Sequence, residues 1–324
     1  MPNVFFYEVF QEEERALKRT LPKTIRAGFT RKTIQEAKHK NPPSALISIR
    51  TQSVVFDHWA PQIKGILTRS QGYDHVLAYC QRINKKIPCG YLADYCSRAV
   101  AEQAILMTTA LLRKLPRQIS HFKRFDRDGL TGREVSGRNL LVVGVGGIGS
   151  EIVDLGRSLK MNVKGVDLKV RFKNLDYVTL TEGIRWAEVM IAALPLTRKT
   201  NQLLSYSKLK KARPGLILVN VGRGEVTPLK DLDQLLKEGV LGGLGLDVFE
   251  NEPRLAQNLR SNPKPPSPDD RIVLQWLNND RCLLTPHNAF NTVEAVEKKA
   301  RESVGAVQAF LKKGKFPHPV PNQD

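Results

Sequence analysis

Cysteine is scarce in this chain, and its spacing does not match a metal site. The four thiols among 324 residues are Cys80, Cys89, Cys96 and Cys282, and no two of them form a Cys-x-x-Cys pair. This spacing does not predict zinc ligation or a disulfide scaffold. We therefore expect buried or incidental thiols in a reducing compartment and no bound metal.

The sequence also lacks an obvious membrane segment and a secretion signal. The most apolar helix candidate, residues 99–112, is too short to cross a bilayer and contains Glu102 and Gln103. The first nine residues lack the charged, apolar and small-residue blocks of a signal peptide. Both absences favour a cytoplasmic protein without a membrane partner.

No polybasic tail, RNA-binding motif or zinc finger accompanies the positive charge. The formal net charge is +19 and the isoelectric point about 9.9, but Lys and Arg are spread over the whole length. A solvated basic surface that attracts an anionic cofactor and substrate explains this better than a nucleic-acid partner does. Hydrophobic residues make up 41% and charged residues 26%, a globular composition long enough for two domains.

One stretch has the pattern of a dinucleotide-binding unit. The apolar run 140–143 leads into Gly144, Gly146 and Gly149, a helical segment follows, and a second apolar run ends at Asp167. Gly144 would allow a tight turn, Gly146 a close approach to a pyrophosphate, and Gly149 the packing of helix on strand. The N–H groups at the start of the helix would bind the phosphates.

Asp167 indicates which dinucleotide to expect. A carboxylate at this distance from the glycines accepts hydrogen bonds from the adenosine ribose, and its charge repels a 2′-phosphate. Lys169 and Arg171 lie just beyond it and weaken this preference slightly. We therefore predict NAD rather than NADP. A glycine turn with a purely structural role would leave Asp167 unexplained.

Apolar runs alternate with helical patterns on both sides of this unit. In the first part we expect strands at 3–9, 45–49, 65–67 and 87–91 and helices at 12–21, 32–40, 74–84 and 99–112. In the second part we expect strands at 189–193, 216–220, 244–247 and 282–284 and helices at 206–212, 228–238 and 292–313. Residues 121–138 and the proline-rich 262–270 predict connections. This alternation predicts an α/β fold with parallel sheets.

Polar residues follow the strands of the second half. They are Arg223, Asp247, Glu252 and His287. Ligands of open parallel sheets bind at the carboxyl ends of the strands, so these side chains would line the nicotinamide crevice. Arg223 would hold a 2-keto acid, His287 would donate a proton as hydride arrives, and Glu252 would orient His287. We expect structural roles for the other histidines, which are His39, His58, His75, His121 and His318.

Together, these motifs resemble the D-isomer-specific 2-hydroxyacid dehydrogenase family over nearly the whole chain. They are Thr-Arg-Ser-Gln-Gly-Tyr-Asp at 68–74, Tyr-Cys-Ser-Arg-Ala-Val-Ala-Glu at 95–102, the glycines of 144–149, Leu-Pro-Leu-Thr at 194–197, Val-Gly-Arg-Gly-Glu-Val at 221–226, Gly-Leu-Asp-Val-Phe-Glu-Asn-Glu-Pro at 245–253 and Thr-Pro-His-Asn-Ala at 285–289. The stretches around 249–252 and 286–292 look most like the D-lactate dehydrogenase branch. The resemblance implies hydride transfer between NADH and a small 2-keto acid, which gives a D-2-hydroxy acid.

The resemblance also implies residue roles. His287 would be the acid/base, Glu252 its partner and Arg223 the substrate-binding arginine. Backbone N–H groups of Gln71 and Gly72 would bind the substrate carboxylate, with Tyr95 nearby. Besides the three glycines and Asp167, the cofactor contacts implied are Gly147, Ile148, Leu194, Pro195, Thr200, Val221, Gly222, Arg223 and Asp247.

The family layout implies two doubly wound parallel-sheet domains. A Rossmann NAD-binding domain, residues 98–289, would be inserted into a flavodoxin-like substrate domain, residues 1–97 and 290–324. A hinge near Ser97 and Phe290 would close and exclude water. The resemblance further implies a homodimer formed through the NAD-binding domain, with residues 99–112 contributing.

Departures from the family pattern leave the substrate open. Cys96-Ser97 follows Tyr95 where Ser-Pro is common, Gln71 stands where small or apolar residues are frequent, and Gly222 replaces a frequent Ser or Thr. We expect pyruvate/D-lactate first, and glyoxylate or hydroxypyruvate reduction second because Gln71 suits a polar substrate tail. An NADH-sensing binding protein of the same fold is a rival, as is oxidation of formate or phosphite. The intact set of Arg223, Glu252 and His287 favours an enzyme.

Overall fold

The computed structural model describes residues 1–261 and 266–321, which divide into two compact units. Unit 1 comprises Met1–Cys96 and Asn291–Asp324, and unit 2 comprises Ser97–Phe290. The chain therefore leaves unit 1, builds unit 2 and returns through its last helix. Unit 2 is thus inserted into unit 1, as the fold class expected from the sequence requires.

Unit 1 is built on a parallel sheet. Its strands are β1 (Val4–Phe6), β2 (Ala27–Phe29), β3 (Leu46–Ile49), β4 (Gly65–Thr68) and β5 (Cys89–Gly90). All described pairs are parallel, and the order is β2-β1-β3-β4-β5. This is the flavodoxin-like order, which confirms the predicted class. The sequence did not predict β2, because it is short, only half-buried and interrupted by Gly28.

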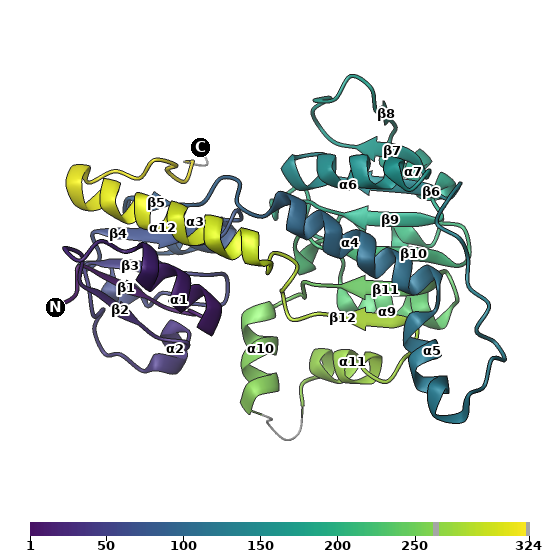
Figure 1. Cartoon of the computed structure of the whole chain (residues 1–324), viewed down its shortest axis with the longest axis horizontal. Coiled ribbons are helices and arrows are strands. Elements are labelled where there is room, and N and C mark those ends of the chain that lie inside the picture. The colour runs from purple at the N-terminus through teal and green to yellow at the C-terminus, as the bar shows by residue number, and fades with distance from the viewer. Residues whose placement is uncertain (262–265, 322–324) are drawn as a thin grey trace. The chain divides into compact units, whose positions relative to one another are not determined.

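Helices cover both faces of this sheet. They are α1 (Gln11–Thr20), α2 (Ile34–Ala37), α3 (Asp74–Arg82) and α12 (Val293–Lys313). Figure 1 shows α12 beside α1, and α12 also contacts β4. Side chains of α3 pack into a core that includes Tyr7, Ile47, Trp59 and Ile66. The last helix thus completes the domain that the first residues begin.

Unit 2 contains the larger sheet. Its strands are β6 (Asn139–Val143), β7 (Asn162–Val166), β8 (Asp176–Tyr177), β9 (Val189–Ala192), β10 (Leu216–Asn220), β11 (Leu241–Leu246) and β12 (Cys282–Leu284). The described pairs are parallel, and the order is β12-β11-β10-β9-β6-β7-β8. The strand order reverses between β6 and β9, which is where a Rossmann fold binds its dinucleotide.

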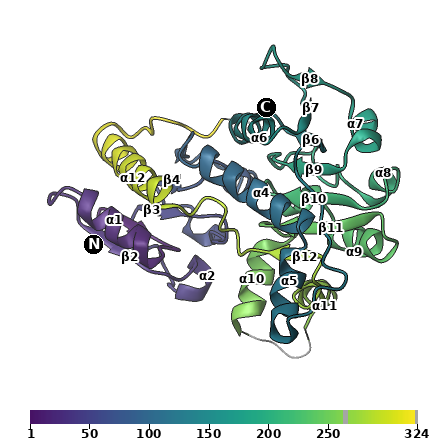
Figure 2. The same cartoon turned by 45° about the vertical axis from the view of Figure 1, so that its right-hand side comes forward.

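Helices also cover both faces of the larger sheet. They are α4 (Ser97–Leu112), α5 (Leu115–His121), α6 (Gly147–Ser158), α7 (Leu180–Trp186), α8 (Tyr206–Leu209), α9 (Leu229–Lys237), α10 (Glu252–Ser261) and α11 (Pro268–Trp276). Figure 2 shows α4 on one face and α7, α8 and α9 on the other. Leucines of α9 pack with β10 and β11 in the main core. The apolar helix α4 contacts β10, β11 and α6.

Several helices were absent from the sequence prediction. The expected connection 121–138 begins within helical residues, because α5 ends at His121 and a 3₁₀ turn follows at Phe122–Arg124. Residues 262–265 of the expected loop lie outside the described residues, and α11 already begins at Pro268. Capping boxes at Thr179–Glu182 and Ser267–Asp270 start α7 and α11, and both can be recognised in the sequence.

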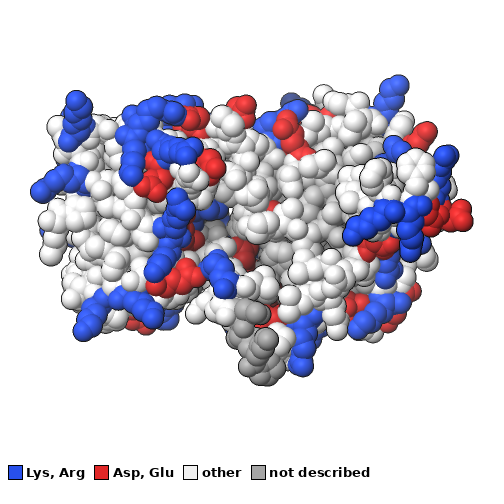
Figure 3. Space-filling view, turned by 60° about the horizontal axis from the view of Figure 1, so that its bottom comes forward, with Lys and Arg blue, Asp and Glu red and all other residues white. Residues whose placement is uncertain are grey.

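The charged surface is mixed on the face that Figure 3 presents. Lys and Arg side chains are scattered over that face and interspersed with Asp and Glu. This distribution agrees with the dispersed basic residues of the sequence. Within residues 1–261 and 266–321, the structure contains no helix that combines the length and the apolar character needed to span a bilayer.

Candidate active site

His287 lies in the loop after β12, where its backbone adopts a strained conformation. His287 has φ 52°, in the left-handed region that non-glycine residues rarely adopt. Its N–H donates to the Asp247 carbonyl at 2.8 Å. Such conformations persist where the surroundings hold them, and they concentrate at functional sites. The backbone itself therefore distinguishes His287 from an ordinary loop histidine.

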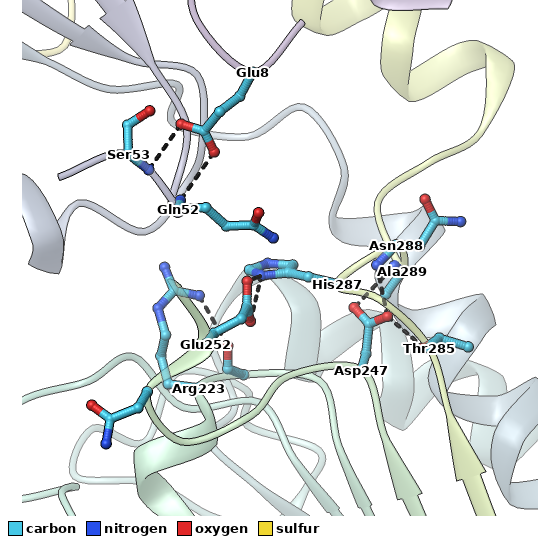
Figure 4. Close-up of polar contacts among 12 residues, drawn as sticks. Glu8, Gln52, Ser53, Arg223, Asp247, Glu252, Thr285, His287, Asn288 and Ala289 are labelled. Carbon is cyan, nitrogen blue, oxygen red and sulfur yellow. Dashed lines mark hydrogen bonds and ion pairs between the residues drawn. The ribbon is translucent and has the colours of Figure 1, made fainter. Parts of the chain in front are cut away.

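Asp247 holds this loop in place. Its carboxylate is 1% exposed and accepts hydrogen bonds from Thr285 Oγ1 at 2.5 Å, Asn288 N at 2.7 Å and Ala289 N at 3.0 Å (Figure 4). Burial raises the pKa of Asp247, against the opposing effects of the His287 charge and these hydrogen bonds. Asp247 thus joins the end of β11 to the His287 loop. Its expected contact with the cofactor stays a prediction.

His287 and Glu252 form a close pair. His287 Nδ1 lies 2.7 Å from Glu252 Oε1 and 2.9 Å from Oε2, and the side chains are 19% and 14% exposed. Glu252 is the first residue of α10, where the helix dipole favours a negative charge. Pairing through Nδ1 leaves Nε2 on the opposite side of the ring, which is the arrangement of an oriented general acid.

Arg223 follows β10 in a loop that glycines allow to pack closely. A Cβ at Gly222 would lie 2.6 Å from the Leu194 carbonyl oxygen, and one at Gly224 would lie 1.9 Å from the Phe249 carbonyl carbon. Only glycine fits beside Arg223 on either side. Figure 4 shows the guanidinium directed toward the side where His287 and Glu252 lie.

Asn220 holds the loop that carries Arg223 in place through its side-chain hydrogen bonds. It is fully buried, its Oδ1 accepts from Gly222 N at 3.0 Å, and its Nδ2 donates to the Arg223 carbonyl and Thr227 Oγ1 at 2.9 Å each. Sequence reasoning missed this residue. The signal available was an asparagine that ends the otherwise apolar strand β10 directly before the Arg223 motif.

The glycine turn between β6 and α6 fits a bound dinucleotide. Gly144 has φ 95°, and a Cβ at Gly149 would lie 2.0 Å from the Gly144 carbonyl oxygen. A Cβ at Gly146 would meet no atom within 4 Å, so the backbone there borders open space at the start of α6. These are the geometric conditions for backbone binding of a pyrophosphate.

Asp167 lies at the end of β7, next to that turn. Its Oδ2 accepts from Val145 N at 2.8 Å and its Oδ1 from Lys169 N at 3.0 Å. Each carboxylate oxygen can accept more than one hydrogen bond, so these contacts leave capacity for the ribose hydroxyls. Asp167 therefore supports the glycine turn, in addition to its expected role with the adenosine.

The other expected cofactor residues of unit 2 lie in the loops after β9 and β10 and at the start of α6. Thr200 Oγ1 donates to the Pro195 carbonyl at 2.6 Å and accepts from Thr197 N at 2.8 Å, so it shapes this loop. Leu194 approaches Gly222, and Val221 is 6% exposed. Gly147 and Ile148 begin α6. The cofactor contacts of these residues stay predictions.

The expected substrate residues of unit 1 lie after β4 and β5. Ser70 Oγ donates to the Gly72 carbonyl at 2.6 Å, which shapes the loop 70–72. The Gln71 side chain donates to the Ala93 carbonyl at 3.1 Å and accepts from Cys96 Sγ at 3.3 Å. The side chain that was expected to suit a polar substrate tail is thus bonded within its own unit. Carboxylate binding by the Gln71 and Gly72 backbone stays a prediction.

A buried charge cluster supports this loop, and the sequence did not predict it. Arg69 Nε donates to Glu13 Oε1 at 2.9 Å, Lys299 Nζ lies 2.7 Å from the same oxygen, and all three side chains are fully buried. Burial raises the pKa of Glu13, but the charges of Arg69 and Lys299 outweigh it and lower the value to about 2. Burial lowers the pKa of Lys299 to about 7. The Lys299 ammonium also lies 5.7 Å from the ring centroid of Tyr95, which is only 7% exposed.

Glu8 holds the loop after β3 in place by accepting hydrogen bonds from its backbone. Its carboxylate accepts from the backbone N–H groups of Arg50, Gln52 and Ser53 at 3.0 Å each. Figure 4 shows the contacts with Gln52 and Ser53. The loops that follow β1 and β3 are therefore tied together at the carboxyl edge of the smaller sheet. Glu8 was also missed, because its partners lie more than forty positions away in the sequence.

Residues 105–289 match the profile of the D-isomer specific 2-hydroxyacid dehydrogenase, NAD binding domain. The chain belongs to this family. It is similar to a glyoxylate reductase of Pyrococcus furiosus, at 27% identity over 99% of this chain and 90% of that protein. It is also similar to a D-lactate dehydrogenase of Staphylococcus aureus, at 25% identity over 78% of this chain and 77% of that protein.

A solved structure supports the same assignment. The D-lactate dehydrogenase of Aquifex aeolicus, complexed with NAD and lactic acid, is 28% identical and has a TM-score of 0.84. The match covers 99% of this chain and all of that one. The D-2-hydroxyisocaproate dehydrogenase, at 21% identity and a TM-score of 0.81, shares the fold. The present chain is accordingly a D-2-hydroxyacid dehydrogenase with NAD as its cofactor.

Proposed function

We propose that this dehydrogenase interconverts pyruvate and D-lactate. The observation that carries the proposal is the oriented pair of His287 and Glu252, whose ring nitrogen and carboxylate oxygen lie 2.7 Å apart, on the side toward which Arg223 is directed. An acid and a cation held in this way suit a substrate that has both a carbonyl and a carboxylate.

Each polar residue then has a defined task. Bound NADH supplies the hydride that the carbonyl carbon accepts. Arg223 binds and orients the 2-keto acid, and the backbone of Gln71 and Gly72 binds its carboxylate. His287 donates a proton from Nε2 to the developing alkoxide, and Glu252 keeps the ring oriented and stabilises the imidazolium. Asp247 keeps His287 in position through the loop 285–289.

Glyoxylate is the second candidate substrate. The similarity to a glyoxylate reductase at 27% identity over 99% of the chain favours it as much as the D-lactate dehydrogenase relatives favour pyruvate. Pyruvate is placed first because the stretches around 249–252 and 286–292 resemble the lactate branch. Hydroxypyruvate, which Gln71 suggested from the sequence, ranks below these two because the Gln71 side chain is bonded to Ala93 and Cys96.

A substrate panel tests the proposal. Purified protein is mixed with NADH and, separately, pyruvate, glyoxylate, hydroxypyruvate, 2-ketobutyrate, oxaloacetate or phenylpyruvate, and NADH absorbance is followed, with NADPH as a parallel arm. We expect the highest kcat/KM with pyruvate and NADH, and chiral chromatography should show only D-lactate. A higher value with glyoxylate would replace pyruvate by the second candidate, and an L-product would contradict the mechanism.

We further propose that the enzyme is a cytoplasmic homodimer in which α4 contributes to the interface. The support is the family resemblance and the apolar character of α4, whose Leu106 is 59% exposed in the single chain. Sedimentation velocity should give a species of twice the chain mass, and Leu106→Glu should shift it toward the monomer. A monomeric wild-type protein at micromolar concentration would contradict the dimer.

A further inference from the structure

Two thiols of unit 1 lie close together at the edge of the smaller sheet. Cys80 belongs to the last turns of α3 and Cys89 is the first residue of β5, nine positions later. Their Sγ atoms are 3.7 Å apart. A disulfide requires about 2.05 Å between the sulfurs, so the two Sγ atoms lie in contact without being bonded. Neither residue belongs to the catalytic machinery described above.

The surroundings give the two thiols different chemical roles. Cys80 is half-buried, and Cys89 is 8% exposed. A hydrogen bond from the Cys89 thiol, helped by one from the Ile87 backbone, lowers the pKa of Cys80 to about 7. The same contact, together with burial, raises the pKa of Cys89. Because the thiolate is the reactive form, Cys80 is the nucleophile of the pair, and a reagent in solution reaches it first.

The remaining thiols serve as internal contrasts. Cys96 is 6% exposed and Cys282 is 7% exposed, and burial raises the pKa of each to about 12. Cys96 donates its thiol hydrogen to Gln71, and Cys282 lies in β12 of the other unit. Both have the properties of inert, structural cysteines.

We propose that Cys80 and Cys89 are a redox modification site, at which a peroxide converts the two thiols into a reversible intramolecular disulfide. In the first step, the Cys80 sulfur attacks hydrogen peroxide, which breaks the O–O bond and yields a sulfenic acid and one water. In the second step, the Cys89 sulfur attacks Cys80 Sγ, which forms the S–S bond and releases a second water. The peroxide accepts two electrons, and a dithiol reductant reverses the reaction.

The bond would tie the C-terminal end of α3 to β5. The β5 strand pairs with β4 through Ile66–Cys89 and Leu67–Gly90, and β4 leads into the loop 70–72. At the other end of α3, the Tyr73 ring packs against Tyr91, with centroids 4.8 Å apart. The disulfide would therefore link α3 and β5, two elements whose ends are already held together by the packing of Tyr73 on Tyr91. It depends on no part of the proposed substrate assignment.

The test is a mass-spectrometric map of the full chain. The protein is treated with hydrogen peroxide at neutral pH, its free thiols are alkylated under denaturing conditions, and it is digested with trypsin without reduction. Cleavage gives peptide 70–82 with Cys80 and peptide 87–98 with both Cys89 and Cys96. We expect these two peptides to be linked, and dithiothreitol to separate them. Cys96→Ser should leave the link in place, whereas Cys80→Ser and Cys89→Ser should abolish it.

A second readout on the wild-type protein does not depend on how the variants fold. Iodoacetamide should label Cys80 in the folded, reduced protein at a rate that rises with pH around 7, at least tenfold faster than it labels Cys282.

A variant tests the first chemical step by itself. In Cys89→Ser, dimedone should trap a sulfenic acid on Cys80. A link to Cys96 instead of Cys89, covalent dimers on a non-reducing gel, or both thiols remaining free after peroxide treatment would overturn the proposal.

Discussion

Two glutamates, one in each unit, pair with basic side chains in very different settings. Glu13 is fully buried and lies within 2.9 Å of both Arg69 and Lys299. Glu252 is 14% exposed and pairs with His287, which is itself partly exposed. The backbone differs as well, because His287 has φ 52° and Asn251, directly before Glu252, has φ 53°.

This difference distinguishes the charge cluster around Glu13, which stabilises the fold, from the pair of Glu252 and His287, which is placed to take part in catalysis. Full burial with several partners fixes the loop after β4 and leaves no room for substrate at Glu13. Glu252 instead pairs with His287 Nδ1, which leaves Nε2 of this partly exposed ring on the side away from its partner. Proximity of opposite charges alone therefore does not identify an active site. At His287 it is combined with partial exposure and backbone strain, which concentrate at functional sites.

Replacement of Arg223 should lower catalytic efficiency more than a change at either glutamate. Arg223→Lys keeps the charge but loses the planar fork that binds a carboxylate or carbonyl, so we expect kcat/KM for the keto acid to fall about 10²-fold to 10³-fold. Steady-state kinetics measures this fall in kcat/KM. Arg213→Lys, an exposed arginine of the same unit, should change kcat/KM less than about twofold. Equal effects of the two changes would contradict substrate binding by Arg223.

Replacement of Glu13 should give the largest effect on stability. Glu13→Gln leaves Arg69 and Lys299 buried without a compensating charge, so the free energy of unfolding of unit 1 should fall by about 3 kcal/mol. Hydrogen exchange of peptides from β3 and β4 measures this loss. Glu14→Gln is the control, because Glu14 pairs with the exposed Lys18 on the same helix and should matter by less than about 0.5 kcal/mol.

The corresponding change at Glu252, from Glu to Gln, should lower turnover rather than stability. Glu252→Gln retains an acceptor near His287 but removes the charge that stabilises the imidazolium, so kcat should fall about tenfold to fiftyfold. The unfolding free energy should stay within about 1 kcal/mol of wild type, as denaturant titration would show. A stability loss like that of Glu13→Gln, with kcat unchanged, would remove the distinction between the two sites.

Acid should weaken unit 1 through Glu13. Its pKa is about 2 in the folded chain and 4.5 without the cluster, so the unfolded state binds more protons between these values. The Glu13 contribution to stability is complete above pH 4.5 and decreases as the pH falls toward 2. Hydrogen exchange at several pH values should show this slope in wild type, and Glu13→Gln should flatten it. Parallel slopes would contradict the effect.

The sequence predicted the parts whose signals are local. Strand, glycine turn, helix and acid follow one another from 140 to 167, and the rule that ligands bind at the carboxyl ends of parallel strands selected Arg223, Glu252 and His287. The structure brings the last two together at hydrogen-bonding distance. Helices α7 and α11 could have been predicted from their capping boxes.

The residues that were missed depend on distant partners. Glu13 lies among Glu12 and Glu14 in the first turn of α1, a pattern typical of a solvated helix start, yet its partner Arg69 is 56 positions away. Asn220 acts on backbone groups of a loop whose course is not evident from residue type. Such contacts arise from packing, which hydrophobic patterning alone does not reveal.

Turnover of His287→Gln tests the central claim most directly. NADH consumption is measured with the best keto acid of the panel, and NADH fluorescence confirms that the variant still binds the cofactor; His58→Gln, an exposed histidine of unit 1, is the control. We predict a loss of about 10³-fold in kcat for His287→Gln, because the general acid is gone, and none for the control. A kcat within about threefold of wild type would show that His287 is not the acid.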